Sequence, residues 1–235
     1  MNLLKTVAIA ITLLLFGCKK DAATFGNINI QLTHKVDTQV FEFNAMNYTC
    51  AAGYTYKISR LQYYLSGFAL KDSKGNLITS KKVFYVDAQQ EATQLISLAG
   101  MPLGSYTDIY FYIGLDTAQN KSNALDATIE NANMSWPDAM GGGYHFLKLE
   151  GYYTGNSGNA GFAMHLGKNG NAVPIHIEKK FEIQPNQQPL LSLNMNLNEW
   201  LKNPEVYDFA ADGSYSMNSD SAMKKLYRNG VDVFN

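Results

Sequence analysis

Short segments in which apolar and polar residues alternate, separated by turns rich in Gly and Asn, constrain the fold of this chain more than any other feature. Residues 27–32 show the pattern clearly, because Ile28, Ile30 and Leu32 recur at every second position and share one face of an extended strand. Similar segments follow along the chain, and they do not alternate with long helical segments. The sequence therefore predicts an all-β fold, an antiparallel β-sandwich of the Greek-key kind.

About ten short strands are expected in total. A hairpin turn at residues 72–76 separates the first Tyr- and Leu-rich segment from two shorter ones. In the segment 144–153, alternation puts His145, Leu147 and Leu149 on one face and Lys148 and Glu150 on the other. Beyond residues 27–32, the predicted strands are 54–70, 77–79, 83–87, 109–114, 144–153, 162–167, 172–177, 180–183 and 190–197.

Two long loops and one helix complete the expected architecture. Residues 120–133 are polar and Asn-rich, which predicts a loop with one or two helical turns at residues 125–129. Residues 136–143 combine Pro137 with three consecutive glycines, so we expect a turn of special conformation there. Near the C-terminus, residues 219–227 predict a short helix with Ser219 or Ser221 as its N-cap.

The N-terminus has the features of a bacterial lipoprotein signal. A cationic start with Lys5 precedes an apolar run at residues 7–16, which ends in the lipobox Leu15-Phe16-Gly17-Cys18. The run is too short to span a membrane. We therefore predict a signal peptide at 1–17, a tether at 18–25 that begins at acylated Cys18, and a β domain at 26–235. The lipids would anchor the protein to the outer membrane, in the periplasm or at the cell surface.

Charge balance, cysteine count and the absence of common catalytic motifs exclude several classes of function. The chain has 19 Lys and Arg against 20 Asp and Glu, and this near balance excludes the basic surface that nucleic-acid binding requires. After lipidation of Cys18, Cys50 is the remaining thiol, so an internal disulfide cannot form. Catalytic signatures such as Gly-x-Ser-x-Gly, the phosphate-binding loop or His-Glu-x-x-His do not occur. We expect a binding protein rather than an enzyme.

The four histidines are the candidate ligands. His34, His145 and His165 fall near predicted strand ends, whereas His176 lies between two isoleucines and is expected to face outward. Neutral imidazole is a common ligand for copper and zinc, and a thioether from Met140 or Met164 would favour Cu(I). The alternative is that each histidine has a structural role.

A resemblance supports the metal hypothesis. The segment WPDAMGGGYHFLKLEG at residues 136–151 is similar to the MbnP family, also written MbnP/CorA-like, which are periplasmic copper-binding proteins of the methanobactin-operon type. The lipoprotein signal and the extended C-terminus resemble one branch of that family. Further matching segments are LTHKV at 32–36, RLQYYLS at 60–66, IGLD at 113–116, HLG at 165–167 and NEW at 198–200.

The resemblance implies a β-sandwich that binds one copper ion through histidines, beside a tryptophan oxidised to kynurenine. His34 and His165 stand at the family's histidine positions, His145 would be a third ligand, and Trp136 would be the oxidised residue. The family resemblance also implies a diheme peroxidase-like partner that makes the modification. Relatives often show Trp-x-Trp before the glycine turn, whereas this chain has Met134 at the first position. The alternative for Trp136 is a ring packed under the turn.

A second functional class remains open. The chain contains 15 Tyr, 12 Phe and 2 Trp, and a β-sandwich with exposed aromatic rings can bind sugars. Tyr152 and Tyr153 are the candidate platform residues. This alternative is a metal-free surface lipoprotein that binds a ligand or glycan.

Overall fold

The computed structural model describes residues 24–155 and 158–235, and strands dominate these ranges. The predicted signal peptide and Cys18 lie outside them. The longer strands are β1 (Phe25–Val36), β4 (Thr55–Asp72), β7 (Leu95–Pro102), β8 (Gly104–Ile113), β9 (His145–Gly155), β10 (Gly158–Gly167), β11 (Val173–Ile183) and β12 (Leu190–Asn196). The shorter ones are β2 (Gln39–Val40), β3 (Tyr48–Thr49), β5 (Leu77–Thr79) and β6 (Phe84–Asp87).

The strands form two sheets, which confirms the predicted all-β sandwich. The four-stranded sheet has the order β12-β1-β2, with β7 also paired to β1. Its β1–β12 pair is parallel and runs in register from Asn29 opposite Leu190 to Lys35 opposite Asn196. The other pairings between named strands are antiparallel. The parallel pairing of β1 with β12 was not predicted, because it joins segments from opposite ends of the chain.

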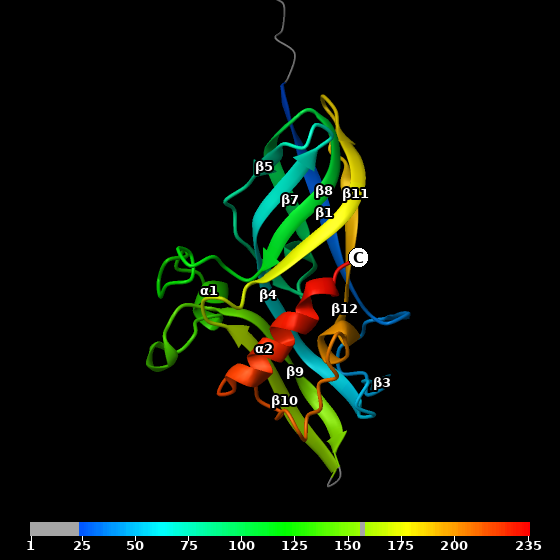
Figure 1. The fold of residues 1–235 in the computed structure, drawn as a ribbon, viewed down its shortest axis with the longest axis vertical. Coiled ribbons are helices and arrows are strands. Elements are labelled where there is room, and N and C mark those ends of the chain that lie inside the picture. The colour runs from blue at the N-terminus through cyan, green and yellow to red at the C-terminus, as the bar shows by residue number, and fades with distance from the viewer. Residues whose placement is uncertain (1–23, 156–157) are drawn as a thin grey trace, which may run out of the picture.

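The second sheet is built around the long strand β4, in the order β10-β9-β4-β8-β11 (Figure 1). β9 pairs with β4 from Tyr56 to Tyr63, and β8 pairs with it from Leu65 to Asp72. Because β6 pairs with residues 62–65 of β4, β9 and β8 share the opposite edge of that strand. Along this edge, β9 pairs with the first half of β4 and β8 with the second half, and the sheet splits between them.

The core lies where the period-two pattern predicted it. Ile28, Ile30 and Leu32 on β1 are fully buried, as are Tyr63 on β4 and Leu147 on β9. Removing such side chains from water is the main stabilising term of the fold. The face of β9 that carries Leu147 is called the core face below.

Two local predictions were wrong, and one long strand was not predicted. The helical turn expected at residues 125–129 is instead α1 (Ile129–Asn133), because the Thr128 side chain accepts a hydrogen bond from Asn131 N and begins the helix there. The two strands expected at 172–177 and 180–183 are one strand, β11, with a bulge between Glu178 and Phe181. β7 was not predicted, although its buried Ile96 and Leu98 alternate with exposed residues.

The predicted C-terminal helix is confirmed as α2 (Asp220–Asn229). The Ser219 side chain accepts a hydrogen bond from Ala222 N and caps it. The helix packs against β10 and the short 3-10 helix η3 (Leu197–Leu201). In the described part of the chain, the helices are too short or too polar to cross a membrane.

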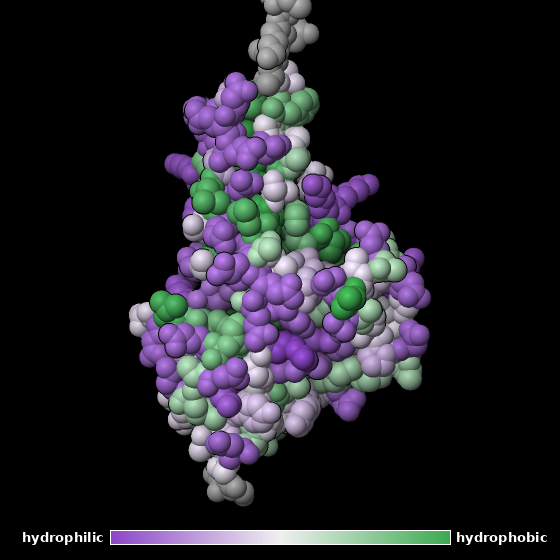
Figure 2. Space-filling model, turned by 180° about the vertical axis from the view of Figure 1, so that it is seen from behind, coloured by the Kyte–Doolittle hydropathy of each residue, from purple (hydrophilic) through white to green (hydrophobic). Residues whose placement is uncertain are grey.

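Seen from behind, the surface mixes hydrophilic and hydrophobic residues, with several hydrophobic ones on the narrower upper half (Figure 2). Such scattered exposure is normal for a folded domain.

Candidate metal-binding site

The glycine turn at residues 136–143 closes on itself. Trp136 N donates to Gly143 O at 2.8 Å, and the short 3-10 helix η2 (Asp138–Met140) spans the turn between them. Gly141, Gly142 and Gly143 have φ values of 108°, 67° and 87°, a left-handed region that favours glycine. The special conformation predicted for this segment is thus present.

The loop that contains Asn120 and Ser122 holds the glycine turn through hydrogen bonds. Asn120 Oδ1 accepts a hydrogen bond from Tyr144 N at 2.9 Å, and Ser122 Oγ accepts one from Gly143 N at 3.1 Å. A Cβ on Gly143 would lie only 2.4 Å from Asn120 Oδ1. The glycines therefore allow the two loops to approach each other and hold Trp136 in place.

A bulge at the start of β9 decides where His145 points. Leu166 pairs with Leu147, but Gly167 pairs with His145, so Phe146 is the extra residue. His165 pairs with Lys148 and thus lies on the face opposite the core face. Since the His145 ring contacts the His165 ring, it lies on that face as well. The prediction that His145 shares a face with Leu147 and Leu149 was wrong, because simple alternation does not hold across a bulge.

Trp136, His145 and His165 form a contiguous cluster. The ring centroids of Trp136 and His145 are 4.7 Å apart, and those of His145 and His165 are 4.8 Å apart at 89°. The Trp136 ring packs directly on Gly167, where a Cβ would meet it at 2.6 Å. Trp136 and His145 are 1% and 4% exposed, so water is largely excluded from these two rings, whereas the His165 side chain is 14% exposed.

His145 has one ring nitrogen bonded and one without a partner. Its Nδ1 donates to Met134 O at 3.1 Å, because a carbonyl oxygen can only accept. Its Nε2 is buried and has no hydrogen-bond partner. Burial, together with the positive charge of nearby Lys148, lowers the pKa of His145 to about 3. At neutral pH the His145 imidazole is therefore neutral and its Nε2 lone pair is free. Neutral imidazole is the form of histidine that binds metals.

His165 is held from two sides. Its Nε2 lies 2.9 Å from Glu150 Oε1, and Glu150 also accepts two hydrogen bonds from Arg60 Nη1 at 3.0 and 3.1 Å. Burial opposes ionisation of Glu150, but the His165 and Arg60 contacts hold the pKa of its carboxyl below the ordinary value. Ser216 Oγ bonds both the backbone N–H and the carbonyl of His165. With Nε2 protonated toward the carboxylate, Nδ1 is the nitrogen left for a metal.

The structure does not bring His34 to this pair. Its Nε2 lies 3.0 Å from Tyr63 Oη, and Tyr63 pairs with Leu147 and so shares the core face. His34 also lines a cavity of about 820 Å³ with Phe41 and Phe43. Burial lowers the pKa of His34 to about 4. His34, on β1 of the smaller sheet, thus packs against one face of the larger sheet, and His165 lies on the other face.

The predicted thioether donors are placed differently from each other. Met164 pairs with Leu149 and points with it to the core face, away from His165. Met140 lies next to the cluster, since its carbonyl oxygen accepts a hydrogen bond from Trp136 Nε1 at 3.3 Å.

Glu150 and Arg60, which orient His165, were not recognised from the sequence as parts of the site. A prediction that β4 pairs with β9 in the correct register would have identified them, because this register sets Arg60 opposite Glu150.

The aromatic platform considered for sugar binding is only half present. Tyr152 is 46% exposed, with Lys57 Nζ 5.1 Å from its ring centroid. Tyr153 is 8% exposed and stacks on Phe209 with centroids 4.4 Å apart. Tyr153 therefore belongs to the core.

Fold and site together define an all-β sandwich protein in which a buried histidine contacts a second, partly buried histidine and a buried tryptophan. The chain belongs to the MbnP family, whose model matches residues 25–219, so the predicted family membership is confirmed. The solved structure of MbnP from Methylosinus trichosporium is similar, with a TM-score of 0.54 and 14% identity over 76% of this chain and 78% of that chain. No curated protein matches this chain. The helix α2 lies just beyond the matched residues.

Proposed function

We propose that this protein is a lipid-anchored, extracytoplasmic copper-binding protein that captures, stores or hands on one copper ion, and that it is not an enzyme. The observation that carries the proposal is the buried His145 Nε2, which has no hydrogen-bond partner and lies beside His165 and Trp136. A buried polar atom without a partner is costly, and a bound metal would remove that cost. Membership of the MbnP family supports the same proposal.

His145 Nε2 and His165 Nδ1 are the proposed ligand atoms. Two neutral imidazoles suit copper in either oxidation state, and the low pKa of His145 keeps its imidazole neutral even in mildly acidic surroundings. Glu150 would orient His165 from behind, as carboxylates commonly do for metal-binding histidines. His34 was predicted as a ligand of the same ion, and that role stays a prediction.

Trp136 is the proposed site of oxidation to kynurenine. One dioxygen molecule, both of whose atoms are inserted, or two hydrogen peroxide molecules, which also release two waters, would cleave the indole C2–C3 bond to N-formylkynurenine. Hydrolysis by one water would then release formate and leave an aromatic amine and a ketone beside His145. A diheme peroxidase-like partner would supply the oxidising power. Because Trp136 is 1% exposed, that partner would have to withdraw electrons through intervening atoms rather than touch the ring.

Copper titration under reducing conditions, in competition with a chromogenic Cu(I) chelator, tests the proposal. The variants His145→Gln and His165→Ala should each lose the bound copper, whereas His176→Ala, an exposed histidine on β11, should retain it. His34→Ala separates the predicted role of His34 from that of the pair. Unchanged copper binding in both His145→Gln and His165→Ala, with native circular dichroism, would overturn the proposal.

A further inference from the structure

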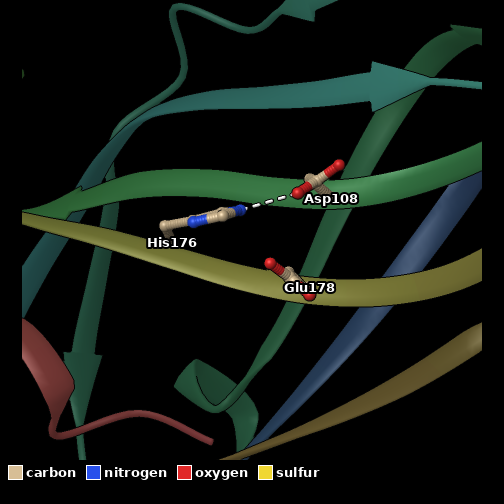
Figure 3. A group of neighbouring side chains, drawn as sticks. All are labelled: Asp108, His176 and Glu178. Atoms are coloured by element: carbon tan, nitrogen blue, oxygen red, sulfur yellow. Dashed lines mark hydrogen bonds and ion pairs between the residues drawn. The ribbon is translucent and has the colours of Figure 1, made fainter. Parts of the chain in front are cut away.

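A second group of metal-ligand side chains lies on strands β8 and β11, away from the histidine pair. Asp108, His176 and Glu178 each offer one ligand atom, and these three atoms lie within 4.8 Å of one another. Figure 3 shows Asp108 on one strand and the other two side chains on its neighbour, with the His176 ring directed at Asp108. We propose that this group binds a divalent first-row transition-metal cation of the Zn²⁺ class.

The register of the two strands creates the group. Glu178 stands directly opposite Asp108, and His176 stands opposite Tyr110, so side chains two residues apart on β11 share a face with Asp108. Two carboxylates in directly opposed positions repel each other and destabilise a strand pair. A cation bound between them would turn this repulsion into attraction.

Asp108 and His176 are already fixed in position. His176 Nε2 lies 2.6 Å from Asp108 Oδ1, and the imidazole stacks on Tyr110 with centroids 4.4 Å apart at 5°. Thr107 Oγ1 donates to the other carboxylate oxygen, Oδ2, at 2.6 Å, and Lys71 Nζ lies 3.3 Å from it. Oδ1 is therefore the oxygen left for a cation, and Lys71 neutralises only one of the two negative charges.

Metal binding would replace the proton that His176 shares with Asp108. Zinc ligands at about 2.0–2.1 Å from the ion stand roughly 3.3 Å apart in a tetrahedral site, so the imidazole has to move by less than about 1 Å. The proton on Nε2 would leave, and a neutral ring would take up a proton at Nδ1 from solvent, so that His176 binds the ion as neutral imidazole. Glu178 would supply the third ligand. The His176 side chain is 45% exposed, so water can complete the coordination.

One nitrogen and two carboxylate oxygens define the metal class. Carboxylates are poor ligands for the soft Cu(I) ion, whereas Zn²⁺ accepts His, Asp and Glu together. The two sites of this protein would therefore differ in the ion they select. The inference does not depend on copper binding at His145 and His165.

Calorimetric titration with Zn²⁺ alone tests the inference on the wild type, His176→Ala and Glu178→Gln. Glu182→Gln is the matched control, since it makes the same change on the same exposed strand outside the group. We expect the first two variants to lose one zinc equivalent or about tenfold or more in affinity, and Glu182→Gln to match the wild type. His165→Ala removes any zinc bound at the histidine pair and should leave this equivalent intact.

A second readout identifies the ligand directly. In His165→Ala, which removes any zinc bound at the histidine pair, zinc should shift the Nε2 resonance of His176 in nitrogen NMR spectra and raise the melting temperature. Both effects should vanish when His176→Ala is added. Wild-type protein that takes up no zinc at millimolar concentration would overturn the inference. Equal losses in Glu178→Gln and Glu182→Gln would overturn it as well.

Discussion

Glu150 and His165 are joined by a hydrogen bond of 2.9 Å, in which the imidazole Nε2 donates to the carboxylate Oε1. The bond joins neighbouring strands β9 and β10 and fixes the orientation of the His165 ring. Arg60 holds the carboxylate from β4, so three adjacent strands determine the position of one proposed ligand.

Replacing Glu150 should weaken copper binding without abolishing it. Glu150→Ala removes the acceptor that orients His165, and the loss of such a partner typically lowers metal affinity by about 10–100-fold. Glu150→Gln keeps a hydrogen-bond acceptor and should show a smaller loss. Chelator competition measures both affinities, with Glu182→Ala as the exposed-carboxylate control. Wild-type affinity in Glu150→Ala would contradict an orienting role.

The metal-free protein should lose stability as the pH falls from about 6.5 toward about 4. His34 and His145 have pKa values of about 4 and about 3 in the folded protein, below the ordinary value of 6.5. The unfolded chain therefore binds more protons in this range, so the free energy of unfolding rises with pH. Between pH 7 and pH 5 each group should account for about 2 kcal/mol.

Urea unfolding at pH 7 and pH 5 measures this pH dependence. The variants His34→Gln and His145→Gln should each reduce the difference between the two pH values. His176→Gln serves as the control at an exposed histidine and should keep it. Equal pH dependence in all three variants would show that neither buried imidazole is responsible.

Alanine at Gly143 should destabilise the protein more than alanine at Gly141. Both glycines have positive φ, so both substitutions incur backbone strain of about 1 kcal/mol. At Gly143 the new Cβ would also meet Asn120 Oδ1 at 2.4 Å, whereas at Gly141 nothing lies within 4 Å. We expect at least about 2 kcal/mol for Gly143→Ala in urea unfolding. Equal losses would show that Asn120 moves aside freely.

Mass spectrometry of the protein from its native host should find oxidation at Trp136. Conversion of tryptophan to kynurenine adds about 4 Da to the fragment that contains Trp136. Trp200 is the internal control, because it is equally buried but its ring packs on Gly230, whereas the Trp136 ring packs on Gly167 and His145. The same spectrum reports acylation of Cys18 as an increase of several hundred daltons. An unmodified Trp136 in copper-loaded protein would contradict the kynurenine proposal.

The strands of the core could be predicted because their signal is local. Ile28, Ile30 and Leu32 alternate over one short segment, and burial of one face follows from that pattern alone. The pairing of β1 with β12 could not be predicted, since a parallel pair between distant segments leaves no trace in either one. The same holds for the way β8 and β9 share one edge of β4.

The sequence by itself determined which residues can bind a metal and which turn must contain glycines. Tertiary structure decided which of those residues meet. A bulge at Phe146 turned His145 toward His165 and Trp136, while the contact of His34 on β1 with Tyr63 places His34 against the core face of the larger sheet. Strand register made Asp108, His176 and Glu178 neighbours. The physical reason is that register and bulges are set by packing between segments far apart in the chain, whereas ligand chemistry belongs to each residue alone.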